Sequence, residues 1–175
     1  RDGGVEFLDA YQQAQAESDD VDDTDELGFV QYLKTVDCIV MGRNTWESLP
    51  LAHRPLKGRP NLVVTSKTPA EMPLPKDVQR LRSLSDLQST YRDRLVFVIG
   101  GISLIKEALT FPSLDSVYLT LIDGDFSFQA DVVLSELLPL LSAKPKTIVH
   151  QDTLINRKDE KSYHVTMYRI SLQKD

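Results

Sequence analysis

Two glycine-bearing turns hold the residues of this chain that are best suited to chemistry. The first turn lies in Asp37–Glu47 and contains Gly42, and the second lies in Leu95–Leu104 and contains Gly100 and Gly101. In each, a short apolar run leads into an expected helix start. A helix start behind a glycine offers unpaired backbone N–H groups, which bind anions. Two such turns predict one elongated anionic ligand, most simply a dinucleotide.

The composition narrows the class of protein that must position these turns. The chain has 175 residues, of which 41% are hydrophobic and 26% charged, as expected for one compact α/β domain. No apolar stretch approaches the ~20 residues of a membrane span. The net charge of −6 argues against a nucleic-acid partner. The single cysteine, Cys38, fits a reducing cytosol, and the histidines have no zinc-ligand spacing. We therefore expect a cytoplasmic protein that binds no metal.

Apolar runs alternate with helical segments along most of the chain. This pattern predicts a mostly parallel central sheet with helices on both faces and an antiparallel C-terminal edge hairpin. Strands are expected at 38–41, 61–65, 78–81, 95–99, 116–122, 147–153 and 162–170. Helices are expected at 5–17, 25–36, 43–49, 85–91, 102–109 and 134–141.

Several of these segments resemble a known family. Met41–Leu49 reads MGRNTWESL and is similar to the signature of dihydrofolate reductases. Further similarities follow in the family's order at Arg54–Asn61, Val64–Ser66, Val98–Gly101, Val117–Thr120 and Ser162–Val165. The resemblance extends from near Asp25 to near Ile170, and it implies a dihydrofolate-reductase-like fold.

The front of the chain departs from that pattern. Dihydrofolate reductases carry an N-terminal strand and then a loop with Leu-Pro-Trp, neither of which this sequence contains. Asp2–Leu8 is similar instead to reductases built like the C-terminal half of the bifunctional riboflavin-synthesis deaminase-reductase. In those relatives a strand ending in Ser-Leu-Asp-Gly precedes this segment. We therefore expect a single domain over residues 1–175 whose first strand lies upstream of Arg1.

The resemblance implies NADPH as the cofactor. The residues that it assigns to the cofactor are Gly42, Arg43, Asn44 and Thr45 for the phosphates, Thr65, Ser66 and Lys67 for the adenosine end, Ile99, Gly100 and Gly101 for the nicotinamide side, and Ser103 and Leu104 near the pyrophosphate. It also implies a cis peptide between Gly100 and Gly101. The residue types leave plainer readings open. Arg43 also fits a surface cation beside a simple turn, and Ser66 and Thr68 fit turn hydrogen bonds before Pro69.

The substrate residues follow from the same resemblance. Glu26 matches the family's pteridine-holding carboxylate, although it also fits a solvated helix cap. Thr120 matches a residue that hydrogen-bonds that carboxylate and the ring, although it also fits an ordinary strand position. Arg59 matches the arginine that grips the α-carboxylate of the folate tail, although it also fits a loop cation. Phe29, Val30 and Leu49 are assigned to the substrate pocket.

These assignments predict an NADPH-dependent oxidoreductase that transfers a hydride to a pteridine or pyrimidine-type heterocycle. Dihydrofolate and a riboflavin-pathway aminouracil both remain open as substrates. The alternative is a non-catalytic NADPH-binding module of the same fold. The expected partner is a small heterocyclic molecule, and a homodimer is left open.

Overall fold

A computed structural model describes residues 36–123, 139, 145–155 and 160–172. The chain divides into two compact units, one formed by Gln31–Leu114 and the other by Arg1–Val30 with Asp115–Asp175. Each unit has its own sheet within the described residues. The helices expected at 5–17 and 25–36 lie outside the described residues, and so does the helix expected at 134–141 apart from Pro139. The expectation of a single domain stays a prediction.

The Gln31–Leu114 unit contains a four-stranded parallel sheet. Its strands are β1 (Cys38–Gly42), β2 (Asn61–Val64), β3 (Val78–Leu81) and β4 (Val96–Gly100), in the spatial order β3-β2-β1-β4. All three neighbouring pairs are parallel. The four strands expected from the sequence are confirmed to within one residue at each end.

Helices and short turns connect these strands. They are α3 (Arg43–Ser48), the 3-10 turns η1 (Leu51–His53) and η2 (Leu84–Asp86), α4 (Leu87–Thr90) and α5 (Ile102–Ala108).

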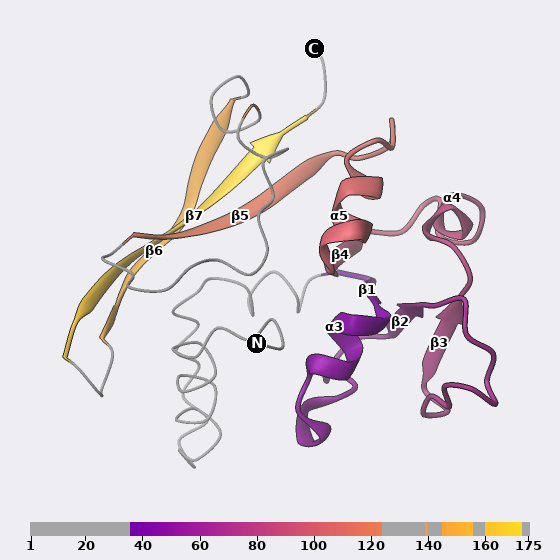
Figure 1. Cartoon of the computed structure of the whole chain (residues 1–175). Coiled ribbons are helices and arrows are strands. Elements are labelled where there is room, and N and C mark those ends of the chain that lie inside the picture. Colours follow the sequence, from indigo (N-terminus) through magenta and orange to yellow (C-terminus); the bar gives the residue numbers. More distant parts are fainter. Residues whose placement is uncertain (1–35, 124–138, 140–144, 156–159, 173–175) are drawn as a thin grey trace. The chain divides into compact units, whose positions relative to one another are not determined.

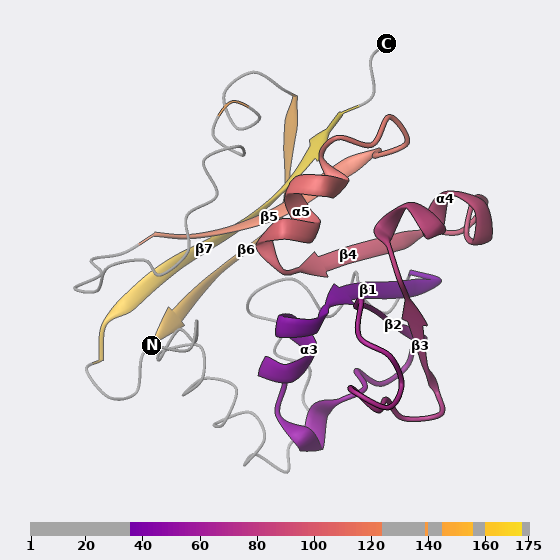
Figure 2. The same cartoon turned by 45° about the vertical axis from the view of Figure 1, so that its right-hand side comes forward.

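Strand β1 is buried on both faces. Ile39 and Met41 pack in one apolar cluster with Trp46 of α3. Cys38 and Val40 alternate with them and pack in a second cluster to which α5 contributes. In Figures 1 and 2, α3 and α5 lie on opposite sides of β1. Each fully buried aliphatic side chain of this kind stabilises the fold by roughly 1.5–3 kcal/mol, so β1 anchors the unit.

The helix expected at 85–91 is divided in the structure. The Ser83 hydroxyl accepts a hydrogen bond from the Ser85 N–H at 3.3 Å, and the Asp86 carboxylate accepts one from the Ser83 N–H at 3.2 Å. This reciprocal capping box starts η2, and α4 follows it for only four residues. The sequence predicted a helix here and missed its tighter first turn.

The second unit contains an antiparallel sheet of β5 (Ser116–Asp123), β6 (Lys146–Ile155) and β7 (Ser162–Ser171), in the order β5-β7-β6. β7 alternates between buried Tyr163, Val165 and Met167 and more exposed neighbours, so one face of the sheet is apolar. The β6–β7 pair confirms the expected C-terminal antiparallel hairpin (Figure 1).

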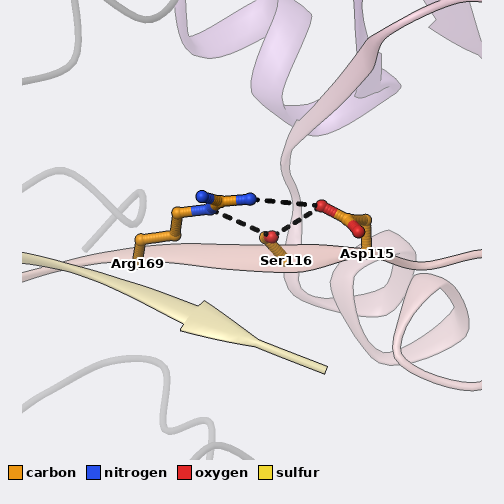
Figure 3. A network of polar contacts seen from close by, with 3 residues as sticks. All are labelled: Asp115, Ser116 and Arg169. Atoms are coloured by element: carbon orange, nitrogen blue, oxygen red, sulfur yellow. Dashed lines mark hydrogen bonds and ion pairs between the residues drawn. The ribbon is translucent and has the colours of Figure 1, made fainter. Parts of the chain in front are cut away.

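A polar network ties the start of β5 to the end of β7 (Figure 3). The Ser116 hydroxyl donates to the Asp115 carboxylate at 2.8 Å, and Arg169 Nε donates to the Ser116 hydroxyl at 3.3 Å. Arg169 Nη2 also lies 3.6 Å from the Asp115 carboxylate, with the two side chains 49% and 56% exposed. At such exposure the ion pair is worth at most about 1 kcal/mol. The network therefore fixes strand ends more than it stabilises the fold.

Candidate functional site

The strand order creates a switch point between β1 and β4. From β1 the chain proceeds to β2 and β3 on one side and then crosses to β4 on the other side. In open parallel sheets, ligands bind outside the carboxyl ends of the strands where the order reverses. β1 ends at Gly42 and β4 ends at Gly100, and Met41 pairs with Gly100 in the ladder. The two glycine turns therefore open at the same edge of one sheet, as the sequence predicted.

The space beside Gly100 at this edge is too small for a side chain. A Cβ added at Gly100 would lie 2.9 Å from Thr45 Oγ1, and Gly100 has a φ of +148°. A Cβ at Gly42 would lie 3.4 Å from Leu104 Cδ1 and 3.5 Å from the Gly101 nitrogen. The expected cis peptide between Gly100 and Gly101 is present. Glycine is thus required at position 100 by both conformation and contact.

The ladder between β1 and β4 is irregular just before this point. Val40 pairs with Val98 and Met41 pairs with Gly100, so Ile99 is an extra residue in β4. Such a bulge re-aims the residues that follow it and is frequent beside functional sites. Ile99 itself packs beside the cluster that contains Trp46.

Arg43–Thr45 follow β1 directly. Arg43 is half-buried and Asn44 is exposed. Within the described part of the chain, no hydrogen bond or ion pair engages the Arg43 guanidinium. Helix α3 is only six residues long and α5 only seven, so their dipoles are small. At the end of β1, the group that suits a phosphate is therefore the Arg43 guanidinium.

Thr65–Lys67 follow β2, the strand beside β1, at the same edge. Thr65 is 6% exposed, and its hydroxyl accepts a hydrogen bond from the Lys67 N–H at 3.1 Å. The side chains of Ser66 and Lys67 are exposed. The Arg80 guanidinium donates to the Lys67 carbonyl at 2.7 Å and holds the turn from β3. The buried Thr65 hydroxyl thus shapes this turn. The same turn presents the Ser66 hydroxyl and the Lys67 ammonium to solvent.

The end of the same turn has its own capping pair. The Thr68 N–H donates to the Glu71 carboxylate at 2.8 Å, and the Thr68 hydroxyl accepts from the Glu71 N–H at 3.4 Å. The hydrogen bonds from Thr68 lower the pKa of Glu71. The turn hydrogen bonds that the sequence left open are therefore present at Thr68.

Two other predicted site residues, Leu104 and Leu49, belong largely to the packing of the unit. The Leu104 side chain is buried in the cluster under α5, so only its backbone could face a ligand. Ser103 beside it is exposed. Leu49 packs beside Trp46 at the end of α3.

Arg59 lies at the opposite edge of the parallel sheet. It precedes β2 by two residues, whereas Thr65 directly follows β2. At about 3.3 Å per extended residue, the two positions are about 20 Å apart along the strand. Partial burial lowers the pKa of the Arg59 guanidinium, which donates a hydrogen bond to the Lys57 carbonyl. A ligand bound at the carboxyl ends of β1 and β4 therefore does not reach Arg59. Contact with Arg59 requires a second molecule that extends along the sheet.

The remaining predicted residues lie outside the described ranges or belong to the other unit. Glu26, Phe29 and Val30 lie outside the described residues. Thr120 belongs to β5 in the other unit, where it pairs with Met167 and is half-buried.

Over the ranges that the structure describes, no cluster of histidine, cysteine and carboxylate side chains could hold a metal ion. In those same ranges, no helix combines the length and the hydropathy of a membrane span.

Sequence reasoning missed two residues that shape the loop between α3 and β2. Arg54 donates to the Trp46 carbonyl at 3.0 Å and its guanidinium carbon lies 5.5 Å from the centre of the Trp46 ring. Asn61 is buried and hydrogen-bonded to the same loop. Arg54 reaches eight positions back along the sequence and Asn61 reaches five positions back to Leu56, so the residue types alone gave no signal.

Comparisons with known proteins agree with this geometry. The sequence model of the dihydrofolate reductase family matches residues 22–170. The chain is 37% identical over 102 residues to the dihydrofolate reductase of Pneumocystis carinii, covering 53% of this chain and 48% of that protein. It is 36% identical over 118 residues to the bifunctional dihydrofolate reductase-thymidylate synthase of Glycine max, covering 62% of this chain and 22% of that protein. The matches thus span half or less of these curated relatives.

A solved structure shows the same fold. The Schistosoma mansoni dihydrofolate reductase superposes with a TM-score of 0.67 at 24% identity, covering 98% of this chain and 91% of that one. The expected fold class is therefore confirmed.

Proposed function

Because the chain belongs to the dihydrofolate reductase family, whose cofactor is NADPH, we propose that it reduces dihydrofolate with NADPH. The proposed reaction adds a hydride to a pteridine carbon and a proton to the adjacent ring nitrogen. The observation that carries the proposal is the meeting of Gly42 and Gly100 at the carboxyl ends of two neighbouring parallel strands. This is the position at which α/β sheets bind dinucleotides.

The described residues fit the cofactor. Gly100 and Gly101 present backbone without side chains, so a flat ring can approach closely. Arg43 supplies a guanidinium for the pyrophosphate, and Ser66 and Lys67 supply a hydroxyl and an ammonium for a 2′-phosphate. When bound, NADPH supplies the hydride and its electron pair. The protein contributes orientation and the exclusion of water.

The substrate assignment rests on the family and on Arg59. The Arg59 guanidinium lies before β2, at the edge of the sheet opposite Gly42 and Gly100, and it suits the carboxylate of a substrate's tail. We assign Glu26 to hold the pteridine and to supply its proton, with Thr120 as a hydrogen-bonding partner, and Phe29, Val30 and Leu49 to the pocket wall. The relatives named above are dihydrofolate reductases, so we place dihydrofolate ahead of a riboflavin-pathway aminouracil. A homodimer and a cytoplasmic location stay predictions.

The test is the loss of NADPH absorbance in the presence of each substrate. We expect steady oxidation with dihydrofolate and none above background with the aminouracil. NADPH binding is measured separately, by fluorescence of the reduced nicotinamide. Turnover of the aminouracil alone would overturn the substrate assignment. NADPH binding without turnover of either substrate would replace the reductase by a non-catalytic binding module.

A further inference from the structure

Asn61, the first residue of β2, is hydrogen-bonded through both ends of its side-chain amide to the loop that precedes the strand. It is 1% exposed. Its Oδ1 accepts a hydrogen bond from the Leu56 N–H at 2.9 Å. Its Nδ2 donates to the Leu56 carbonyl at 2.9 Å and to the Arg59 carbonyl at 2.8 Å. A buried amide that lost these bonds would be costly, so the side chain and the loop hold one another in a single arrangement.

The loop that Asn61 closes contains Arg59. The carbonyls of Leu56 and Arg59 both accept hydrogen bonds from the Asn61 side-chain amide, so the segment between them forms a tight turn. Gly58 lies in this turn with a φ of +89°, which other residues rarely adopt. The Arg59 guanidinium donates to the Lys57 carbonyl inside the same turn. Both the backbone and the side chain of Arg59 are therefore held by a turn that depends on Asn61.

We propose that Asn61 is a positioning residue for Arg59, and that through it Asn61 sets the affinity for the carboxylate of the substrate's tail. The inference rests on the proposed function, because it takes Arg59 as the group that meets that tail. A guanidinium has five N–H donors, so the hydrogen bond to the Lys57 carbonyl uses only part of the donor capacity of Arg59. Bidentate pairing depends on angle, so a turn that fixes Arg59 decides how well the guanidinium fits.

The change Asn61→Asp tests the network with almost no change in volume. The new carboxylate keeps the acceptor for the Leu56 N–H and loses both donors. It then faces the carbonyls of Leu56 and Arg59, which repel it. The turn should shift, and Arg59 should lose its alignment.

The matched substrate pair is dihydrofolate and a dihydropterin that lacks the aminobenzoyl-glutamate tail. In Asn61→Asp we expect the KM for dihydrofolate to rise about tenfold, the loss expected for one misaligned charge-assisted hydrogen bond. The KM for the tail-less dihydropterin, the kcat for both substrates and the dissociation constant of NADPH should stay unchanged. A merely structural role would change these quantities as well.

A second variant disturbs the same turn from its exposed side. A Cβ at Gly58 would meet no atom within 4 Å, so Gly58→Ala acts through the backbone alone. We expect the same selective rise in KM for dihydrofolate, which keeps the test available if Asn61→Asp does not fold. Lys57→Ala is the matched control, because its exposed side chain is removed while its carbonyl still accepts from Arg59. It should leave the selectivity between the two substrates unchanged.

The side-chain N–H signals of Arg59 in an NMR spectrum give a readout that needs no turnover. They should move toward those of free arginine in Asn61→Asp and in Gly58→Ala, and not in Lys57→Ala. Unmoved signals, or an equal rise in KM for both substrates, would overturn the positioning role. A wild-type protein that reduces neither substrate would overturn the proposed function instead, and the Arg59 signals would then decide the positioning role alone.

Discussion

Gly100→Ala places a methyl group where the two glycine turns meet. The added Cβ would lie 2.9 Å from Thr45 Oγ1, with Thr45 Cγ2 and Cβ at 3.6 and 3.8 Å. Thr45 is short and β-branched, so its side chain has little freedom to move out of the contact. The φ of +148° at Gly100 adds backbone strain for any residue with a side chain.

The expected loss of unfolding free energy has two parts. A residue with a Cβ held in a glycine-only backbone region costs about 1–3 kcal/mol. Overpacking against Thr45 costs about 1–3 kcal/mol more. Together they predict that Gly100→Ala lowers the free energy of unfolding by about 2–6 kcal/mol.

Urea unfolding of four proteins separates the two parts: wild type, Gly100→Ala, Thr45→Ala and the double variant. Thr45→Ala removes the hydroxyl and the methyl group that the new Cβ meets. The double variant should therefore regain about 1–3 kcal/mol relative to Gly100→Ala, while the backbone strain remains. Gly58→Ala is the control for strain without contact, and it should cost only about 1–2 kcal/mol.

Two results would refute this reasoning. Gly100→Ala could unfold within about 0.5 kcal/mol of the wild type, a change typical of unconstrained surface positions. Alternatively, Thr45→Ala could fail to restore any stability to Gly100→Ala. Either result would mean that the turns do not meet as described.

Three further predictions concern charge and burial. Arg43→Ala should weaken NADPH binding by about 1.5–3 kcal/mol in a fluorescence titration, whereas Arg92→Ala, which removes an exposed cation four residues before β4 begins, should not. Equal effects of the two changes would contradict a phosphate role for Arg43. Because its folded pKa is lowered by Thr68, the Glu71 carboxylate stabilises the fold above its ordinary pKa of 4.5 and loses that contribution as pH falls through the lower folded value. Glu71→Gln should therefore reduce the loss of unfolding free energy as the pH falls below 4.5. An unchanged pH dependence of the unfolding free energy would refute the stabilising role of the Glu71 carboxylate. Burial, and then Asp37, raise the pKa of the Cys38 thiol, so maleimide should label it only after unfolding, and rapid labelling of the folded protein would contradict that burial.

The sequence predicted the parallel sheet well because its strands are short apolar runs bounded by glycine, proline and polar residues. β1 is buried on both faces, and β4 packs partly buried apolar side chains against both clusters, so their runs show no alternation and cannot be mistaken for surface strands. The glycine at each strand end predicted where the site would open. Only the pairing of Met41 with Gly100 shows that the two turns meet, because strand order is not encoded in either segment.

The contacts that shape the site were much harder to predict. Thr45 matched a phosphate-binding position by resemblance, yet its hydroxyl also packs against Gly100 across the sheet edge. Asn61 looked like an ordinary strand start, and its three hydrogen bonds depend on how the preceding loop folds back. Such contacts depend on the backbone path, and residue type and spacing alone do not determine them.

The backbone amide NMR signals that respond to NADPH locate the bound cofactor on the sheet. A single dinucleotide across the switch point should shift the amides of Gly42, Ser66 and Gly100, at the carboxyl ends of three neighbouring strands. The amides of Cys38 and Val96, at the amino ends of β1 and β4, should not respond. Shifts confined to the amino ends, or to one of the two glycine turns, would contradict a single dinucleotide bound across the switch point.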